Sequence, residues 1–506
     1  MTRIFFAILI VASLVWSSAR AETSPEERVA ALKELKIESG TISSVKREDA
    51  PALKSPDGKV IRNNIPPRTV IKVLLNPAQG SNIHVEICLP DAGKWNGRFV
   101  GLGNGGAAGH IDSNSLAGWS SGGFAVATTD MGTAPAPQSG NGNKEVWKDF
   151  GFRATHLMTV VGKQFVNAYY GKAPEFSYFN GGSTGGQQAL QEAQRYPEDY
   201  DGIVAAVPAH CRTPLHAYFL WNDQILKKCP FNKTQEEAVV AAGIEYMASR
   251  EIPAAAGKFV SDPRCTAKDI EAVVALALKK DATLTKEHAE ALRKLLDGPH
   301  AATGERVFNG IPFGSSLQSA HGHLYLFTWV FGAEKKTDDI NFAADIDTYT
   351  TSLAPWLNAE NPDLSAFAKR GGKILLSSGT ADSIVPYHAT LNYYERLIEQ
   401  SGGLEKAQSF ARFYLIPGMA HGGGGPGINQ SPNLFDAMKN WRETGTAPNA
   451  LPGKRVASGK TEIEMPIYPY PTKTGWDAAT SSYKPVDGPR GGVERVAARF
   501  SPPATE

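Results

Sequence analysis

Short apolar stretches alternate with glycine-rich turns and amphipathic stretches between Val60 and about Pro208. These apolar stretches have the length and composition of strands. They are Ile83–Leu89, Arg98–Leu102, Phe124–Thr128, Phe176–Phe179 and Gly202–Val207. Gly151–Tyr170, by contrast, has apolar side chains at the spacing of a helix. Alternating strands and helices predict an α/β fold, in which helices cover a mostly parallel sheet.

This alternation stops between Ala209 and Leu364, where the pattern is mostly helical. The clearest helices there are Thr266–Lys279 and Thr285–Leu296. After Gly372 the alternation returns, and it predicts the strands Lys373–Ser377 and Ala411–Ile416 and the helices His388–Glu399 and Phe435–Arg442. We therefore predict one sheet domain, residues 22–208 and 365–506, interrupted by a lid domain, residues 209–364. The tail after Gly445 is rich in proline and glycine and is expected to lie along the surface.

The first residues have the pattern of an export signal. Arg3 precedes an apolar run from Ile4 to Trp16, and small residues mark a cleavage site at Ala19-Arg20-Ala21. An uncleaved membrane anchor is the alternative, but the apolar run is too short to span a bilayer comfortably. We therefore predict that residues 1–21 are a signal peptide. The mature chain is expected to be secreted or periplasmic and not to be held at a membrane.

Export would place the cysteines where disulfides form. Cys88, Cys211, Cys229 and Cys265 allow two bridges in three connectivities, and the sequence does not choose among these. The last three cysteines lie in one region of the chain. At least one bridge is therefore expected among them.

The charge of the chain is nearly balanced, with 52 basic and 51 acidic residues. No net field would therefore draw the protein to nucleic acid or to an anionic membrane. With 42% hydrophobic residues in a chain of 506, a large core can be buried. The composition favours a globular protein whose partner is a small molecule.

A nucleophile elbow is the strongest chemical motif. The aromatic-rich strand Phe176–Phe179 leads into Asn180-Gly181-Gly182-Ser183-Thr184-Gly185-Gly186, and Gln187–Arg195 then has the pattern of a helix. G-x-S-x-G alone is weak evidence in a chain with 50 glycines. Between a strand and a helix, however, it is typical of the turn that exposes a strained serine. We predict that Ser183 is a nucleophile.

The chain after the lid contains the two partners that such a serine needs, in the order acid and then base. Asp382 follows the strand that begins at Lys373, and His421 follows the strand Ala411–Ile416 and stands before four glycines. Taken alone, Asp382 would be interpreted as a loop-capping aspartate and His421 as a surface histidine. Together with Ser183 they predict a serine esterase that works through an acyl-enzyme. The fold class is then an α/β-hydrolase fold with a large, mostly helical lid inserted between the nucleophile and the acid.

Two backbone N–H groups are needed to bind the oxyanion. One is expected from Thr184, which follows the nucleophile, and the other from Gly105 or Gly106, in the glycine loop after the strand Arg98–Leu102. The same loop matches the dinucleotide fingerprint Gly101-x-Gly103-x-x-Gly106, with Asp130 further on. That fingerprint must open a helix, and Ala107–Gly123 has no sustained helical period. We therefore favour the oxyanion loop and predict no cofactor.

Several segments carry a specific resemblance to the tannase and feruloyl esterase family, which also contains hydrolases of mono(2-hydroxyethyl) terephthalate. The matching segments are Lys94–Phe99, Gly103–Gly106, Asp149–His156, Ser177–Gly186, Ala193–Gly202 and Pro417–His421. The resemblance covers most of the mature chain. It implies an α/β-hydrolase domain with a large lid that acts on esters of aromatic acids.

The sequence departs from that family at three places. A family cysteine before the nucleophile pairs with one after the catalytic histidine, but here these positions are Gly182 and Gly422, so other contacts must hold His421. A late family cysteine is replaced by Tyr468. The calcium loop of the family lid corresponds to Glu251–Cys265, which offers one aspartate, so no calcium is expected there.

The substrate is expected to be a small aromatic ester, of a hydroxycinnamic or hydroxybenzoic acid. The close alternative is a terephthalate monoester, which would need a cationic lid side chain to meet its free carboxylate. A hydrolase-fold binding protein without turnover is a third hypothesis. Among the lid aromatics, Trp329 is a candidate to stack on the acyl ring, although such residues are more often core. His321-x-His323 lacks a third ligand at suitable spacing, so no metal site is predicted.

Overall fold

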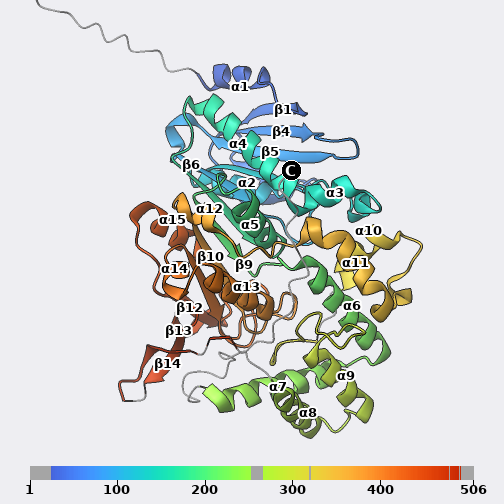
Figure 1. Ribbon diagram of the computed structural model, residues 1–506. Helices are drawn as coiled ribbons and strands as arrows, with labels where there is room; N and C mark the ends of the chain where they lie inside the picture. Colours follow the sequence, from blue (N-terminus) through green and yellow to red (C-terminus); the bar gives the residue numbers. More distant parts are fainter. Residues whose placement is uncertain (1–23, 252–265, 318–320, 478, 489, 492–506) are drawn as a thin grey trace, which may run out of the picture.

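The computed structural model describes residues 24–251, 266–317, 321–477, 479–488 and 490–491. The predicted signal peptide (residues 1–21) and residues 252–265, which include Cys265 and the loop where no calcium is expected, lie outside these residues. Figure 1 shows a central sheet with helices on both sides and a group of helices at one end. No helix in the described ranges is long and apolar enough to cross a membrane.

The central sheet has nine strands in the order β1-β4-β5-β7-β6-β8-β9-β10-β11. Neighbouring strands from β7 to β11 are parallel, while β1, β4, β5 and β7 pair in antiparallel fashion. In sheet order the strands are β1 (Gly40–Glu48), β4 (Arg68–Leu75), β5 (Ile83–Pro90), β7 (Ala125–Thr129), β6 (Arg98–Leu102), β8 (Phe176–Gly182), β9 (Gly202–Ala206), β10 (Lys373–Gly379) and β11 (Ala411–Ile416). The α/β class and the predicted strands are confirmed.

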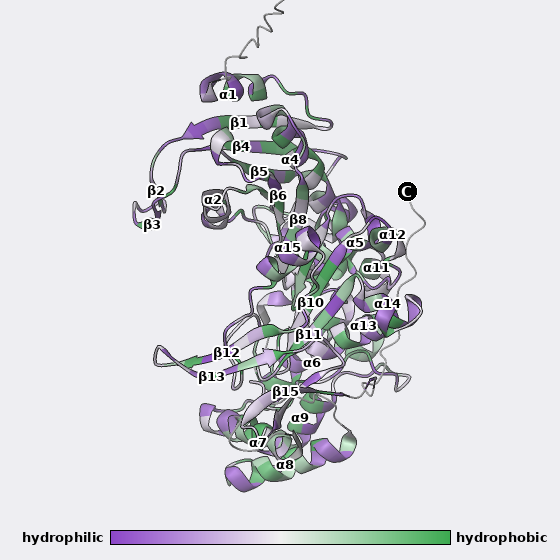
Figure 2. Ribbon diagram, turned by 90° about the vertical axis from the view of Figure 1, so that its left-hand side faces the viewer, coloured by the Kyte–Doolittle hydropathy of each residue, from purple (hydrophilic) through white to green (hydrophobic). Residues whose placement is uncertain are grey.

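Both faces of the parallel part of the sheet are buried, which is why its strands are nearly continuous apolar runs rather than alternating ones. Successive side chains of a strand point to opposite faces. On β6, Phe99 packs into the core on one face and Val100 into the core on the other. The helices of this domain are α1 (Pro25–Lys33), α2 (Ser113–Ser121), α3 (Lys144–Lys148), α4 (Ala154–Tyr170), α5 (Thr184–Arg195), α12 (Ser365–Lys369), α13 (Tyr387–Gln400), α14 (Leu404–Gln408) and α15 (Leu434–Thr444). In Figure 2, α2 lies on one side of the sheet and α4, α5 and α13 lie on the other.

The segment between the neighbouring strands β9 and β10 is helical in its described parts. Its α-helices are α6 (Arg212–Lys228), α7 (Lys233–Glu251), α8 (Ala267–Lys280), α9 (Lys286–Asp297), α10 (Tyr325–Phe331) and α11 (Phe342–Leu357). Thr266 and Thr285 cap α8 and α9 with their side chains, which explains why both helices begin where the sequence predicts. The helical lid expected between nucleophile and acid is present, and its domain boundaries stay a prediction.

The tail contains more regular structure than predicted. It forms two antiparallel hairpins, one of β12 (Leu451–Ala457) and β13 (Lys460–Ile467), and one of β14 (Lys473–Asp477) and β15 (Ser482–Val486). Leu451, Met465 and Ile467 are buried in the same core as α15. A further hairpin, of β2 (Ala52–Lys54) and β3 (Val60–Asn63), lies near the N-terminus. The first hairpin of the tail is therefore anchored in the core, whereas β14 and β15 are mostly half-buried or exposed.

The expectation of at least one bridge among Cys211, Cys229 and Cys265 is wrong, because two of these three cysteines are free. Cys88, Cys211 and Cys229 are free thiols. Cys88 and Cys211 are buried in the cores on opposite faces of the sheet, so they cannot meet. Cys211 and Cys229 cap the two ends of α6, roughly 27 Å apart at 1.5 Å per residue, whereas bridged cysteines have Cα atoms closer than about 7 Å.

Candidate active site

Ser183 occupies a strained turn between β8 and α5. Its backbone has φ of 60° and ψ of −118°, which is rare for a residue with a side chain. The turn is tight enough to require glycine on either side. A Cβ atom at Gly181 would lie 2.2 Å from the carbonyl oxygen of Gly185, and one at Gly185 would lie 3.0 Å from the Cα atom of Gly103. The predicted elbow therefore has the geometry that exposes a serine hydroxyl above the sheet.

The structure brings together the three residues that the sequence predicts as a triad. The Nε2 atom of His421 lies 3.0 Å from the Oγ atom of Ser183, and its Nδ1 atom lies 2.8 Å from the Oδ2 atom of Asp382. Asp382 is fully buried, while the side chain of His421 is 29% exposed. Because both distances are within hydrogen-bond range, His421 can take the proton of Ser183 while Asp382 orients the ring.

Backbone groups fix the orientation of Asp382. Its Oδ1 atom accepts hydrogen bonds from the N–H groups of Ile384 and Val385, both at 2.9 Å. This leaves Oδ2 for His421. The acid is held by the loop after β10, at the carboxyl edge of the sheet, where ligands of open α/β sheets bind.

The glycine loop after β6 lies directly against the elbow. Gly103 contacts Gly185 so closely that a Cβ atom at Gly103 would lie 2.5 Å from the Cα atom of Gly185. The N–H group of Gly185 also donates to the carbonyl of Asn104 at 2.8 Å. Within the described residues, the N–H groups of Gly105, Gly106 and Thr184 donate no hydrogen bond. They are therefore free to bind an oxyanion, which is the state expected of such donors before substrate arrives.

A sequence model of the family described as tannase and feruloyl esterase matches residues 69–344 and 332–487. The chain belongs to the tannase and feruloyl esterase family. Feruloyl esterase B of Aspergillus niger is 29% identical over 427 residues, which cover 78% of this chain and 81% of that protein. An uncharacterised esterase of Xanthomonas campestris is 29% identical over 526 residues and covers 90% and 91% of the two chains.

Solved structures agree with this family membership at the level of the fold. Feruloyl esterase B of Aspergillus oryzae superposes with a TM-score of 0.77 at 22% identity, over 91% of this chain and all of that one. Tannin acyl hydrolase of Aspergillus niger superposes with a TM-score of 0.73 at 17% identity, over 94% and 97%. The protein is a carboxylic ester hydrolase of the tannase and feruloyl esterase type.

In this tannase and feruloyl esterase family member, an arginine holds the loop after His421. The Nη1 atom of Arg455, on β12, donates to the carbonyls of Pro426 and Gly427, both at 2.9 Å, and of Gly425 at 3.3 Å. Gly182 and Gly422 stand where the resemblance implies a disulfide. The Arg455 contacts instead join the loop after His421 to β12 through charge-assisted hydrogen bonds to successive carbonyls.

Arg212 is a functional candidate that sequence reasoning missed. Its side chain is 3% exposed, and no carboxylate in the described part of the chain pairs with it. The Nη2 atom donates to the carbonyl of Gly106 at 3.1 Å and to the hydroxyl of Thr184 at 2.9 Å, and the hydroxyl of Thr184 donates to the same carbonyl at 2.6 Å. The guanidinium lies 5.0 Å from the ring centre of Phe150. A buried cation therefore joins the backbone carbonyl of Gly106 to the side chain of Thr184, two residues that are predicted to supply oxyanion donors.

Two histidines share the surroundings of Arg212. Burial, and then the charge of Arg212, lower the pKa of His216 well below its usual value, and the same two causes lower the pKa of His323. Both imidazoles are therefore neutral near neutral pH. No sequence motif marked Arg212, because a lone arginine at the start of a helix is usually a surface residue.

The structure does not support a substrate-binding role for Trp329. Its side chain is fully buried, and its indole N–H donates to the carbonyl of Pro137 at 2.7 Å. The ring packs at an angle against Phe150 and Tyr325. Because every face of the ring is covered by protein, Trp329 is a core residue of the lid helix α10.

Proposed function

We propose that the protein hydrolyses esters of hydroxycinnamic or hydroxybenzoic acids through a serine acyl-enzyme. The observation that carries this proposal is the continuous chain of hydrogen-bond distances from Ser183 through His421 to Asp382. Membership of the tannase and feruloyl esterase family, and the names of its relatives, support the aromatic acyl group.

The proposed reaction has two halves. The Oγ atom of Ser183 attacks the ester carbonyl while Nε2 of His421 takes its proton, and the resulting imidazolium is stabilised by Asp382. His421 then gives the proton to the leaving alcohol as the acyl–oxygen bond breaks. A water molecule, deprotonated by His421, attacks the acyl-enzyme and releases the acid and Ser183. In both halves, the N–H groups of Thr184 and of Gly105 or Gly106 would bind the oxyanion.

A panel of esters tests the substrate class. Mature protein is incubated with methyl ferulate, methyl gallate, mono(2-hydroxyethyl) terephthalate and methyl acetate, which shares its leaving alcohol with the first two esters, and kcat/KM is measured for each. We expect the aromatic-acid methyl esters to be hydrolysed with kcat/KM at least about 10-fold above the acetate, because the acyl ring adds buried apolar contact. Equal values, or a preference for the acetate, would refute an aromatic acyl site.

The terephthalate monoester is a second candidate because of Arg212. Its free carboxylate needs a cation, and Arg212 is a cation beside the elbow without a carboxylate partner among the described residues. Two hydrogen bonds already orient this guanidinium toward Gly106 and Thr184, and its side chain is almost fully buried. Because Arg212 is already engaged by these contacts, we rank the neutral aromatic esters above the terephthalate monoester as substrates.

Replacing Arg212 by methionine is expected to lower kcat roughly 10- to 100-fold with little change in KM. The cation hydrogen-bonds to the carbonyl of Gly106 and the hydroxyl of Thr184, whose N–H groups are proposed oxyanion donors, and the loss of such a donor itself lowers kcat by about 10²- to 10³-fold. The pKa of His323 is expected to rise, because a nearby positive charge that repels the imidazolium is removed. Arg212→Lys should restore part of kcat, and Arg293→Met, at an exposed lid arginine, serves as the control. A drop in thermal stability with unchanged kcat would assign Arg212 to packing alone.

A further inference from the structure

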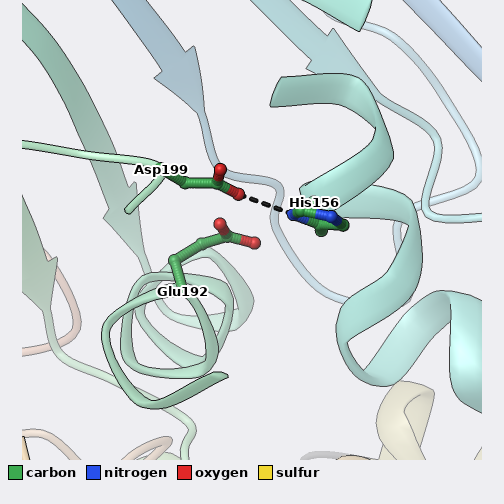
Figure 3. Close-up of side chains that lie close together, drawn as sticks. All are labelled: His156, Glu192 and Asp199. Carbon is green, nitrogen blue, oxygen red and sulfur yellow. Dashed lines mark hydrogen bonds and ion pairs between the residues drawn. The ribbon is translucent and has the colours of Figure 1, made fainter. Parts of the chain in front are cut away.

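A cluster of ionisable side chains lies near the end of α5 that is distant from the elbow. His156 comes from α4, Glu192 from α5, and Asp199 from the loop that leads into β9 (Figure 3). One ligand atom from each of the three lies within 4.8 Å of the others. Figure 3 shows the two carboxylates and the imidazole turned toward one another. The reaction proposed above uses none of these residues.

Glu192 is the unusual member of this cluster. It is fully buried, and among the described residues neither of its carboxylate oxygens has a hydrogen-bond partner. Leaving an ionised carboxylate buried and unpaired is costly, so a native structure is expected to supply a proton or a cation. Burial, and then the carboxylate of Asp199, raise the pKa of Glu192 well above its usual value.

The neighbouring groups do not satisfy Glu192. The ammonium of Lys163 donates to the backbone carbonyl of Asp199, and burial lowers its pKa. The ring of Tyr196 stacks on His156 with ring centres 3.8 Å apart, and the hydroxyl of Tyr200 is hydrogen-bonded to Thr159. The Nδ1 atom of His156 lies 2.7 Å from Asp199. Two carboxylates thus face each other with an imidazole beside them and no donor for Glu192.

We propose that His156, Glu192 and Asp199 bind one divalent transition-metal ion of the Zn²⁺ class. One imidazole and two carboxylates suit such an ion, whereas Ca²⁺ and Mg²⁺ prefer ligand sets made of oxygen. The two negative charges of the carboxylates are neutralised by the charge of the ion. Because carboxylate and imidazole ligands bind an ion in their deprotonated forms, we expect the affinity to rise with pH.

The position of the site assigns it a structural role. Glu192 is eight residues beyond Thr184 on α5, roughly 12 Å along the helix axis, so the ion cannot touch the ester. It would join α4, α5 and the loop before β9. These elements support the turn that carries Ser183, and the site does not depend on the proposed ester chemistry.

Zinc binding by the mature protein tests this proposal. After treatment with EDTA and removal of the chelator, ZnCl₂ is titrated by calorimetry, and Tm is measured with and without zinc. We expect one zinc per chain and a Tm increase of roughly 3 °C at 100 times Kd, which follows from ligand linkage in a chain of this size. The kcat for ester hydrolysis at a temperature well below Tm should not change.

Two variants and a matched control separate the alternatives. Glu192→Gln keeps the shape but removes the charge, and His156→Asn removes the imidazole; both should lose at least about 10-fold in zinc affinity. Glu198→Gln, at a carboxylate in the same loop that is 83% exposed, should bind zinc like the unmodified protein. If Glu192→Gln fails to fold, His156→Asn supplies the same comparison. Absence of stoichiometric zinc binding, or unchanged affinity in the variants, would overturn the proposal and leave a proton shared between Glu192 and Asp199.

Discussion

Replacing Ser183 by alanine is expected to lower kcat for ester hydrolysis by at least about 10⁴-fold. The hydroxyl that forms the acyl-enzyme is removed, and residual turnover then comes from the oxyanion donors and from substrate binding alone. The measurement is the steady-state rate with methyl ferulate and with p-nitrophenyl acetate. KM should change little, because the substituted atom makes its main contribution in the transition state.

The Ser183→Ala experiment needs two controls. One is a serine variant that should stay active, and the other is a measurement showing that Ser183→Ala is folded. Ser431→Ala changes an exposed serine in the loop before α15 and should keep full activity. The Tm of Ser183→Ala should not fall, since replacing the hydroxyl by hydrogen introduces no steric clash and leaves the backbone unchanged. If Ser183→Ala retained full activity, the assignment of the nucleophile would be refuted. If the unmodified, folded protein hydrolysed none of the esters, the esterase chemistry itself would be refuted.

Replacing Asp382 by asparagine is expected to lower kcat by about 10⁴-fold, through the tautomer of His421. The N–H groups of Ile384 and Val385 both donate to Oδ1 of residue 382, so the amide oxygen of asparagine will occupy that position. Its NH₂ group then faces Nδ1 of His421 and makes this atom an acceptor. The ring proton moves to Nε2, which can no longer take the proton of Ser183.

Imidazole N–H signals in NMR spectra check this explanation directly. In the unmodified protein the proton on Nδ1 should be observed, and in Asp382→Asn it should be replaced by a proton on Nε2. Asp363→Asn, at an exposed aspartate before α12, should show the tautomer and the rate of the unmodified protein. An Asp382→Asn variant with unchanged tautomer and unchanged kcat would show that Asp382 does not orient His421.

The three catalytic candidates could be predicted because their signals are local. The elbow needs glycine at fixed positions around Ser183, since any Cβ atom there would clash with the backbone of the turn. Asp382 and His421 each follow a buried strand, and parallel strands bring their carboxyl ends to one edge of the sheet. The apolar strand pattern, the spacing of the glycines and the order of the three residues in the chain were therefore enough to predict these candidates.

Contacts between distant segments explain what sequence reasoning missed. Arg455 reaches the loop after His421 from a hairpin in the tail, where the proline and glycine content suggested a segment lying along the surface. Arg212 becomes significant only because α6 begins beside Gly106. Sequence spacing likewise suggested disulfides, but it says nothing about which face of the sheet a cysteine occupies.

The sequence by itself determined the α/β class, most of the strands, the elbow and the order of the proposed triad, because hydrophobic period and glycine sterics act over a few residues. The tertiary structure alone decided which charges are buried and what they meet. It placed Arg212 against the oxyanion loop, left Glu192 without a donor among the described residues, and put Cys88 and Cys211 on opposite faces of the sheet. Burial and pairing depend on segments far apart in the chain, and no local pattern encodes them.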